Sequence, residues 1–166
     1  MPRLIIVSNR VAVPGSEAPR QAGGLAVAVN AALKQREGIW FGWSGKVAEN
    51  GAVPEPTVVR RQRRTFITLD LSSVDFQEYY NGFANRVLWP ILHYRVDLAE
   101  FTSVELAGYL RVNALFANAL CPFIQPDDVI WVHDYHLLSL AKELRALGHD
   151  IRLASSSISP ARRPTS

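Results

Sequence analysis

The segment that most constrains this chain is a short apolar run followed at once by ionisable side chains. Residues 129–132, Val-Ile-Trp-Val, are typical of a buried strand, and the chain continues as His133, Asp134, Tyr135 and His136. In an open α/β sheet, ligands bind at the carboxyl ends of the strands. Ionisable side chains there are costly to bury unless they bind a ligand or one another. The alternative is a structural role, in which Asp134 caps the helix that follows and the histidines bond to the backbone.

Apolar runs of strand type alternate with helical patterns along the whole chain. The strand-like runs cover residues 4–7, 40–43, 65–69 and 129–132. The helical patterns cover residues 25–34, 105–120 and 137–147, the last with Gly148 as its stop. This alternation predicts a parallel sheet with helices on both faces, and therefore an α/β fold. Between these elements, we expect a hairpin or loop over 45–56, a short helix capped by Ser72, and an interruption at Pro90 within 85–94.

Size and composition narrow the class of protein. The chain has 166 residues, 48% apolar and 20% charged, which suits one domain with its own core. A net charge of +3 is too small to argue for nucleic acid, and we expect the basic cluster Arg60–Arg64 to be a solvated loop without aromatic stacking partners. The single cysteine, Cys121, excludes an internal disulfide and fits a reducing compartment. No apolar run approaches the roughly 18 residues of a membrane span. We therefore expect a cytoplasmic protein with neither nucleic-acid nor membrane partners.

The first candidate ligand group follows the first strand-like run. Arg10 ends that run, and a guanidinium there can form bidentate bonds to a phosphate. Gly23 and Gly24 precede the first helical pattern, where small residues let the backbone approach a ligand and helix N–H groups face an anion. The alternative is a surface arginine and a flexible turn.

The second candidate group is aromatic, and the third is the ionisable run after residue 132. The aromatic set is Trp40, Trp43, Tyr80 and Trp89. Flat rings stack on sugar faces, although any single tryptophan could equally belong to an aromatic core. In the ionisable run, Asp134 could bind sugar hydroxyls or act as a base. Metal binding by His133 and His136 is the weaker alternative, because their spacing spans a strand-to-helix turn without a Cys or Glu partner nearby.

Seven motifs occur in a fixed order over about residues 3–153. They are Val-Ser-Asn-Arg at 7–10, Ala-Gly-Gly-Leu at 22–25, Trp-Phe-Gly-Trp-Ser-Gly at 40–45, Tyr-Tyr-Asn-Gly-Phe at 79–83, Leu-Trp-Pro at 88–90, His-Tyr at 93–94 and Trp-Val-His-Asp-Tyr-His-Leu-Leu at 131–138. Together they resemble the N-terminal half of the trehalose-6-phosphate synthase family, retaining glycosyltransferases of family 20. The resemblance implies the Rossmann-like N-terminal domain of a GT-B enzyme. It also implies transfer of glucose from UDP-glucose to glucose 6-phosphate, giving trehalose 6-phosphate, without a cofactor or a metal.

The resemblance assigns a role to each candidate residue. Arg10 would bind the acceptor phosphate and Asp134 the acceptor hydroxyls. The aromatic contacts to the same glucose 6-phosphate would be Tyr80, Trp89 and one of Trp40 and Trp43, with Trp43 preferred. Gly23 and Gly24 would lie against the donor diphosphate. Front-face retention in this family needs no protein nucleophile, so Asp134 is not expected to be one. For full-length members of the family, assembly into homo-oligomers is a further possibility.

The resemblance ends near residue 153. There the family continues as Gly-Phe-Phe-Leu-His-Ile-Pro, whose histidine contacts the donor sugar, whereas residues 154–160 are Ala-Ser-Ser-Ser-Ile-Ser-Pro. Deleting one G from GGC TTC TTC CTC CAT ATC CCC, one codon choice for the family segment, gives GCT TCT TCC TCC ATA TCC CC, which encodes the observed residues.

We therefore expect residues 1–153 to be a truncated acceptor-binding domain. Residues 154–166 are expected to be a frameshifted, disordered tail rich in serine, proline and arginine. The family's second domain, which clamps the donor, has no counterpart in this sequence. We expect the chain alone to be inactive. The alternative is a non-catalytic sugar-phosphate-binding fragment or a pseudogene product.

Overall fold

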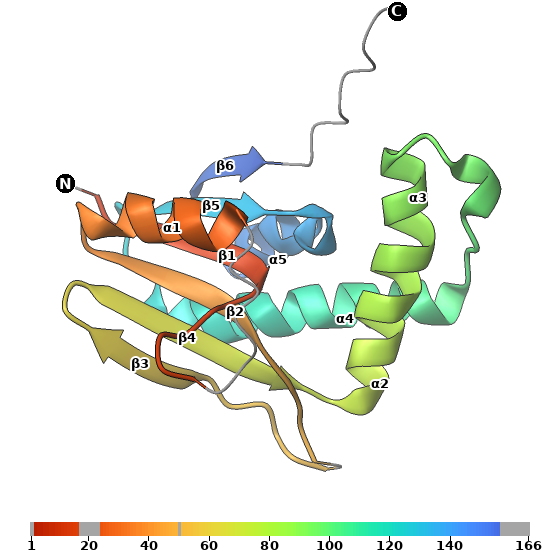
Figure 1. Ribbon diagram of the computed structural model, residues 1–166, viewed down its shortest axis with the longest axis horizontal. Helices are drawn as coiled ribbons and strands as arrows, with labels where there is room; N and C mark the ends of the chain where they lie inside the picture. Colours follow the sequence, from red (N-terminus) through yellow and green to blue (C-terminus); the bar gives the residue numbers. More distant parts are fainter. Residues whose placement is uncertain (1, 17–23, 50, 157–166) are drawn as a thin grey trace, which may run out of the picture.

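A single twisted sheet organises the computed structural model, which describes residues 2–16, 24–49 and 51–156 (Figure 1). The strands are β1 (Leu4–Arg10), β2 (Gly38–Val47), β3 (Thr57–Arg61), β4 (Arg64–Leu71), β5 (Val129–His133) and β6 (Arg152–Ser156). They lie in the order β3-β4-β2-β1-β5-β6, and every neighbouring pair is parallel except β3 and β4. The carboxyl ends of the parallel strands therefore share one edge.

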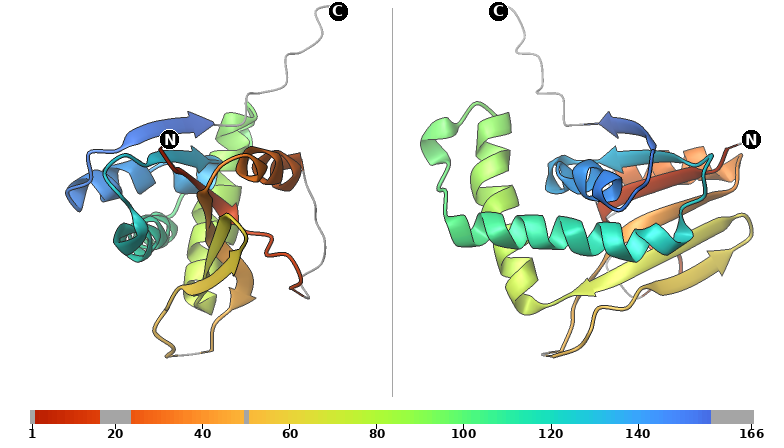
Figure 2. Two further views of the ribbon diagram at one scale, coloured as in Figure 1. Left: turned by 90° about the vertical axis from the view of Figure 1, so that its left-hand side faces the viewer. Right: turned by 180° about the vertical axis from the view of Figure 1, so that it is seen from behind.

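Helices cover both faces of this sheet, as the alternating sequence pattern predicts. The helical elements are α1 (Gly24–Lys34), α2 (Ser73–Asp75), the π-helical η1 (Phe76–Leu88), α3 (Trp89–Leu92), η2 (Val96–Leu98), α4 (Ser103–Leu120), η3 (Cys121–Phe123), η4 (Tyr135–Leu137) and α5 (Leu140–Ala146). Helix α1 lies on one face, and α4 and α5 lie on the other (Figures 1 and 2). The elements α2, η1 and α3 form a column beyond the carboxyl ends of the strands. This column closes one side of the edge where ligands bind in such sheets.

Alternation along the strands divides the core into two clusters. On the α4 side, Phe41 meets Phe116 edge-to-face, with 5.5 Å between ring centroids, and both rings are fully buried. On the α1 side, Trp40 packs against Phe66 beneath Leu33. Because successive strand residues point to opposite faces, neighbours in the sequence join different clusters.

The basic segment Arg60–Arg64 is not a loop, and that prediction is wrong. Arg60 and Arg61 end β3, Arg64 begins β4, and Gln62 makes the turn between them with a φ of 55°. The sheet therefore carries one antiparallel edge strand. An edge strand with both faces near solvent needs no apolar run, so arginines can occupy it.

Several boundaries differ from the sequence-based predictions. Pro90 does not interrupt the helical column, which continues from η1 into α3; the carbonyl of Arg86, four residues before Pro90, accepts instead from the Glu100 N–H at 3.2 Å. The last helix begins at Leu140 after the short turn η4, not at residue 137. Two predictions are confirmed: the Ser72 hydroxyl accepts a hydrogen bond from the Asp75 N–H at 3.1 Å, and Gly148 ends the last helix with a φ of 88°.

The final strand extends beyond the point where the family resemblance ends. Residues 154–156 were expected to leave the sheet, yet Ala154, Ser155 and Ser156 pair in register with residues 131–133 of β5. Backbone hydrogen bonds make this pairing, so they do not require the apolar side chains that the prediction looked for. The remainder of the expected tail, residues 157–166, lies outside the described residues.

Candidate functional site

Arg10 and Trp43 lie side by side at the carboxyl edge of the sheet. The parallel pairing of β1 and β2 places the two residues in register. The guanidinium carbon of Arg10 is 6.0 Å from the centroid of the Trp43 ring, a cation–π distance. Among the described residues, no carboxylate forms an ion pair with Arg10. The guanidinium is therefore held in place while its charge remains available to an anion.

Gly45 makes room for this arrangement. It has a φ of +87°, and a Cβ built on it would lie 2.8 Å from Nε and Nη2 of Arg10. The indole N–H of Trp43 donates to the carbonyl oxygen of Lys46 at 2.8 Å, which fixes the ring against the same segment. The irregular last part of β2 thus orients both the cation and the ring beside it.

A row of rings continues from Trp43 across the column. Tyr80 of η1 lies 5.9 Å from Trp43, and His136 stacks on Tyr80 with 5.3 Å between centroids and 12° between planes. Tyr135 stacks on the same imidazole at 4.1 Å. His136 is buried, and neither ring nitrogen has a hydrogen-bond partner among the described residues. Stacking orients this ring, together with a 3.4 Å contact between its Nδ1 and the Asp134 carboxylate.

Asp134 ends the row. Its Oδ2 is 3.4 Å from Nδ1 of His136, and its Oδ1 accepts a hydrogen bond from the Tyr135 N–H at 2.8 Å. Its backbone has a φ of 82° and a ψ of 157°, a conformation that side-chain-bearing residues rarely adopt and that concentrates at ligand sites. Burial tends to raise the pKa of Asp134, but His136 and the Tyr135 N–H outweigh it, and the pKa is lowered. The carboxylate is therefore ionised at neutral pH and able to accept hydrogen bonds from hydroxyls.

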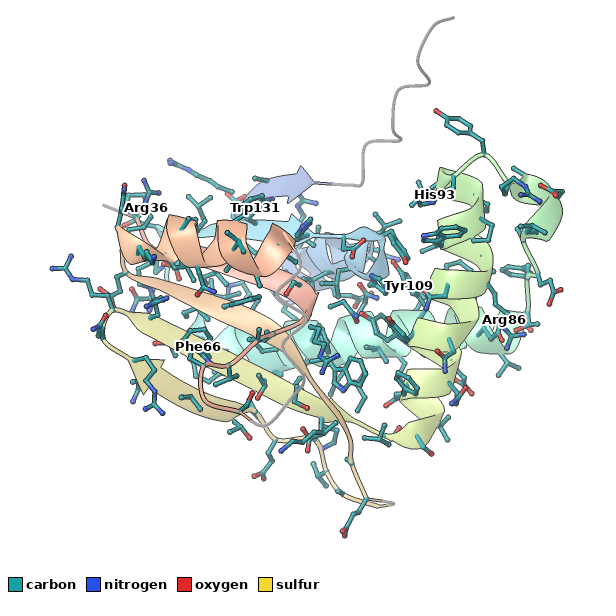
Figure 3. The ribbon with its side chains drawn as sticks, in the orientation of Figure 1. Arg36, Phe66, Arg86, His93, Tyr109 and Trp131 are labelled. Atoms are coloured by element: carbon teal, nitrogen blue, oxygen red, sulfur yellow. The ribbon has the colours of Figure 1, made fainter. Side chains whose placement is uncertain are left out.

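Two side chains of α4 hold the loop that carries Asp134 and His136, and sequence reasoning did not identify them. The Tyr109 hydroxyl donates to the Tyr135 carbonyl at 2.8 Å and accepts from the Leu138 N–H at 3.0 Å. The Asn113 amide donates to the His136 carbonyl at 3.1 Å. Figure 3 labels Tyr109 between the sheet and the column. The available signal was Asn113, a fully buried amide among the mainly apolar buried residues of α4.

The remaining predicted site residues do not join this row. Trp40 is 1% exposed on the α1 side of the sheet and donates its N–H to the Ser8 hydroxyl at 2.8 Å. Trp89 lies on α3, is 43% exposed, and has its ring stacked on His93 at 4.2 Å. Gly24 is the exposed first residue of α1, and Gly23 lies outside the described residues.

The structure also shows whether the described residues could hold a metal ion or cross a membrane. Within them, no group of three or more His, Cys, Asp or Glu side chains is placed to hold a metal ion. Burial lowers the pKa of His133, the other histidine of the run. No helix in the described part of the chain is long and apolar enough to cross a membrane.

The sheet order, the helices on both faces and the ligand-facing edge define a Rossmann-like α/β domain. Its site combines an ionised carboxylate with a guanidinium that has no ion pair within the described residues, and ring contacts connect the two. The family model for glycosyltransferase family 20 matches residues 2–156. This chain therefore belongs to glycosyltransferase family 20.

Named relatives agree with this assignment. The trehalose-6-phosphate synthase of Sinorhizobium fredii is 53% identical over 154 residues, covering 92% of this chain and 33% of the relative. A crystal structure of an alpha,alpha-trehalose-phosphate synthase (UDP-forming) from Burkholderia vietnamiensis superposes with a TM-score of 0.84 at 51% identity, over 93% of this chain and 33% of that one. Another, from Burkholderia xenovorans in complex with glucose-6-phosphate, has a TM-score of 0.82 at 49% identity, over 92% and 32%.

These matches confirm the predicted family and fold class. They also show that the chain spans about a third of the length of the curated relatives it matches.

Proposed function

We propose that this domain is the acceptor-binding part of a trehalose-6-phosphate synthase. In that reaction glucose passes from UDP-glucose to glucose 6-phosphate. The observation that carries the proposal is the row from Arg10 through Trp43, Tyr80 and His136 to Asp134. Membership of family 20 supports it independently.

The chemistry of the row suits a sugar phosphate. A sugar phosphate has a dianionic end and a hydroxylated end, and the row has a guanidinium at one end and a carboxylate at the other. Arg10 would bind the phosphate in bidentate fashion, and Asp134 would accept hydrogen bonds from hydroxyls of the sugar. Of the intervening rings, Tyr80 is partly exposed and would offer its face to the sugar, while the buried rings of Trp43 and His136 pack against it. Trp43 would be the tryptophan on the acceptor side, since its ring packs against Tyr80, whereas Trp40 belongs to the core cluster of the other face.

The donor would lie where α1 begins. We propose that Gly23 and Gly24 allow the diphosphate to approach the N–H groups of the first turn of α1, an arrangement that favours anions. Trp89, exposed on the column, would contact the acceptor from the outer side. The reaction would need neither metal nor cofactor, and Asp134 would act by binding and not as a nucleophile.

Binding and transfer should separate in this chain. The candidate site offers groups for the acceptor, so we expect glucose 6-phosphate to bind to residues 1–166 without measurable transfer from UDP-glucose. Transfer also depends on groups that hold the donor, which contribute much of the positioning and electrostatic stabilisation of the transition state. A cytoplasmic location is part of the same proposal, because it supplies both substrates and keeps Cys121 reduced.

The proposal is tested by calorimetric titration of glucose 6-phosphate, with glucose as the ligand that lacks the phosphate. Arg10→Gln should weaken glucose 6-phosphate binding about tenfold or more and leave glucose unaffected, since one charge-assisted contact to phosphate is lost. Asp134→Asn should weaken both ligands. Arg145→Gln, which removes the same charge from the exposed end of α5, is the matched control and should change neither. Equal affinities for glucose 6-phosphate in Arg10→Gln and Arg145→Gln would overturn the proposal.

An assay of UDP release distinguishes an active enzyme from a fragment that only binds the acceptor. UDP release from UDP-glucose in the presence of glucose 6-phosphate reports transfer. Glucose 6-phosphate binding without UDP release supports a domain that needs the rest of the family fold. Absence of binding favours a fragment without function.

A further inference from the structure

The end of the sheet opposite the proposed acceptor site carries concentrated positive charge. The six cations are Lys34, Arg36, Arg60, Arg61, Arg63 and Arg64, which we call the basic end. With Glu37, the acidic residue beside them in the sequence, these side chains carry a formal charge of +5, which exceeds the +3 of the whole chain. In Figure 3, Arg36 lies at the far end of the sheet from the column of α2 and α3. The proposed acceptor site therefore does not account for this charge.

The charge at the basic end is not compensated within the described residues. None of the six cations forms an ion pair there, whereas Arg3, Arg86, Arg95 and Arg111 each bond to a carboxylate. Arg64 donates instead to the neutral Asn30 side chain of α1 at 3.1 Å. The fold thus fixes one of these guanidiniums without neutralising it.

The register of the β3–β4 hairpin brings two of these charges together. Arg61 and Arg64 are direct partners across the antiparallel pair. Like charges directly opposite one another destabilise a strand pair. Within the described residues neither arginine forms an ion pair, so the hairpin is expected to gain from an anion that binds between the arginines and α1.

A hollow of suitable size lies at this place. Its volume is about 300 Å³, between the last turn of α1 and the hairpin turn. Its lining residues are Leu33, Lys34, Gln62, Arg63 and Arg64. This volume is at the lower limit for small-molecule sites. The hairpin turn and the end of α1 lie at the same end of the sheet in Figure 1.

We propose that this hollow is a second anion site, which binds a small molecule carrying phosphate groups. Arg63 and Arg64 would supply guanidiniums for bidentate contacts to phosphate oxygens. Lys34 would add a third charge and offset the negative end of the α1 dipole, which otherwise repels an anion. The lining set includes no aromatic ring on which bases could stack, which favours a small molecule over single-stranded nucleic acid.

The test uses the full chain with the Arg10→Gln substitution, so that the proposed acceptor site cannot contribute. Inorganic pyrophosphate is titrated by calorimetry, and the amide signals of Leu33 and Gln62 are followed by NMR. Adding Arg63→Gln, at an exposed turn position, should weaken pyrophosphate binding about tenfold or more. Adding Arg64→Lys should also weaken it, because lysine keeps the charge but loses the guanidinium fork. Arg145→Gln in the same background is the control and should leave the affinity unchanged.

Three results would overturn this proposal. They are no pyrophosphate binding to the Arg10→Gln chain, an equal loss in Arg145→Gln, or a single-stranded oligonucleotide that binds more tightly through the same arginines. Circular dichroism of each variant confirms that the fold is retained. Every variant in this test carries Arg10→Gln. A failure to bind pyrophosphate therefore does not count against the proposed acceptor site, and a failure of glucose 6-phosphate binding does not count against the second anion site.

Discussion

Tyr109→Phe removes one hydroxyl and tests whether α4 holds the loop of the candidate site. The hydroxyl donates to the buried carbonyl of Tyr135 and accepts from the N–H of Leu138. Burial raises the pKa of Tyr109 to about 12, so the phenol stays protonated at neutral pH and keeps its role as a donor. Phenylalanine has the same ring and leaves no large cavity, which isolates the two hydrogen bonds.

The magnitude follows from the burial of the two partners. A buried polar group that loses its hydrogen bond costs about 1–3 kcal/mol. We assign about 2 kcal/mol to the Tyr135 carbonyl, which is buried, and about 1 kcal/mol to the partly exposed Leu138 N–H. The expected loss in the free energy of unfolding is about 3 kcal/mol. For a chain of this size the melting temperature should fall by about 6–12 °C.

Urea unfolding followed by circular dichroism measures this loss directly. Tyr94→Phe is the matched control, because Tyr94 is 74% exposed and should change the free energy of unfolding by less than about 0.5 kcal/mol. Glucose 6-phosphate binding to Tyr109→Phe should also weaken, since the loop bearing Asp134 loses its support. Equal stabilities for Tyr109→Phe and Tyr94→Phe would refute the role assigned to this hydroxyl.

Three further changes test other parts of the structure. Gly45→Ala should weaken glucose 6-phosphate binding, measured by calorimetry, because its Cβ would displace the Arg10 guanidinium and its positive φ disfavours alanine. The folded-state pKa of His133 lies below the unfolded value of about 6.5, so the stability it contributes is present above that pH and is lost as pH falls through the folded pKa. Urea titrations from pH 7 to 5 should therefore show a falling free energy of unfolding, with a smaller fall in His133→Asn. Phe116→Ala should cost about 3–5 kcal/mol in the same assay, because it removes a fully buried ring that meets Phe41.

The strands and the edge that binds ligands follow from local patterns. Continuous apolar runs such as 4–7 and 129–132 identify buried parallel strands, and the polar residues after them mark the carboxyl ends. Strand β3 was missed because its exposed, arginine-rich sequence carries no burial pattern. The continuation of β6 through Ser156 was missed because backbone pairing leaves no signature in small polar side chains.

The choice between the two tryptophans shows where local reasoning stops. Residues three apart on a strand point to opposite faces, so the sequence alone predicts that Trp40 and Trp43 separate. It does not determine which face meets Tyr80, because that depends on which helices cover each face. His136 illustrates the same limit, since its stacking on Tyr80 joins segments 56 positions apart in the chain.

The order of the strands explains why the proposed acceptor site forms where it does. In the sheet, β1 lies between β2 and β5, so Trp43, Arg10 and Asp134 leave three adjacent strands at the same edge. Each residue alone has an ordinary structural explanation, as a core ring, a surface cation or a helix cap. The three explanations are not independent of one another, because the carboxyl ends of adjacent parallel strands lie about 4.8 Å apart and bring these side chains together. The topology therefore flanks the Arg10 cation with the Trp43 ring of β2 on one side and the Asp134 carboxylate that follows β5 on the other, and any ligand bound at this edge must present complementary charge and hydroxyl groups.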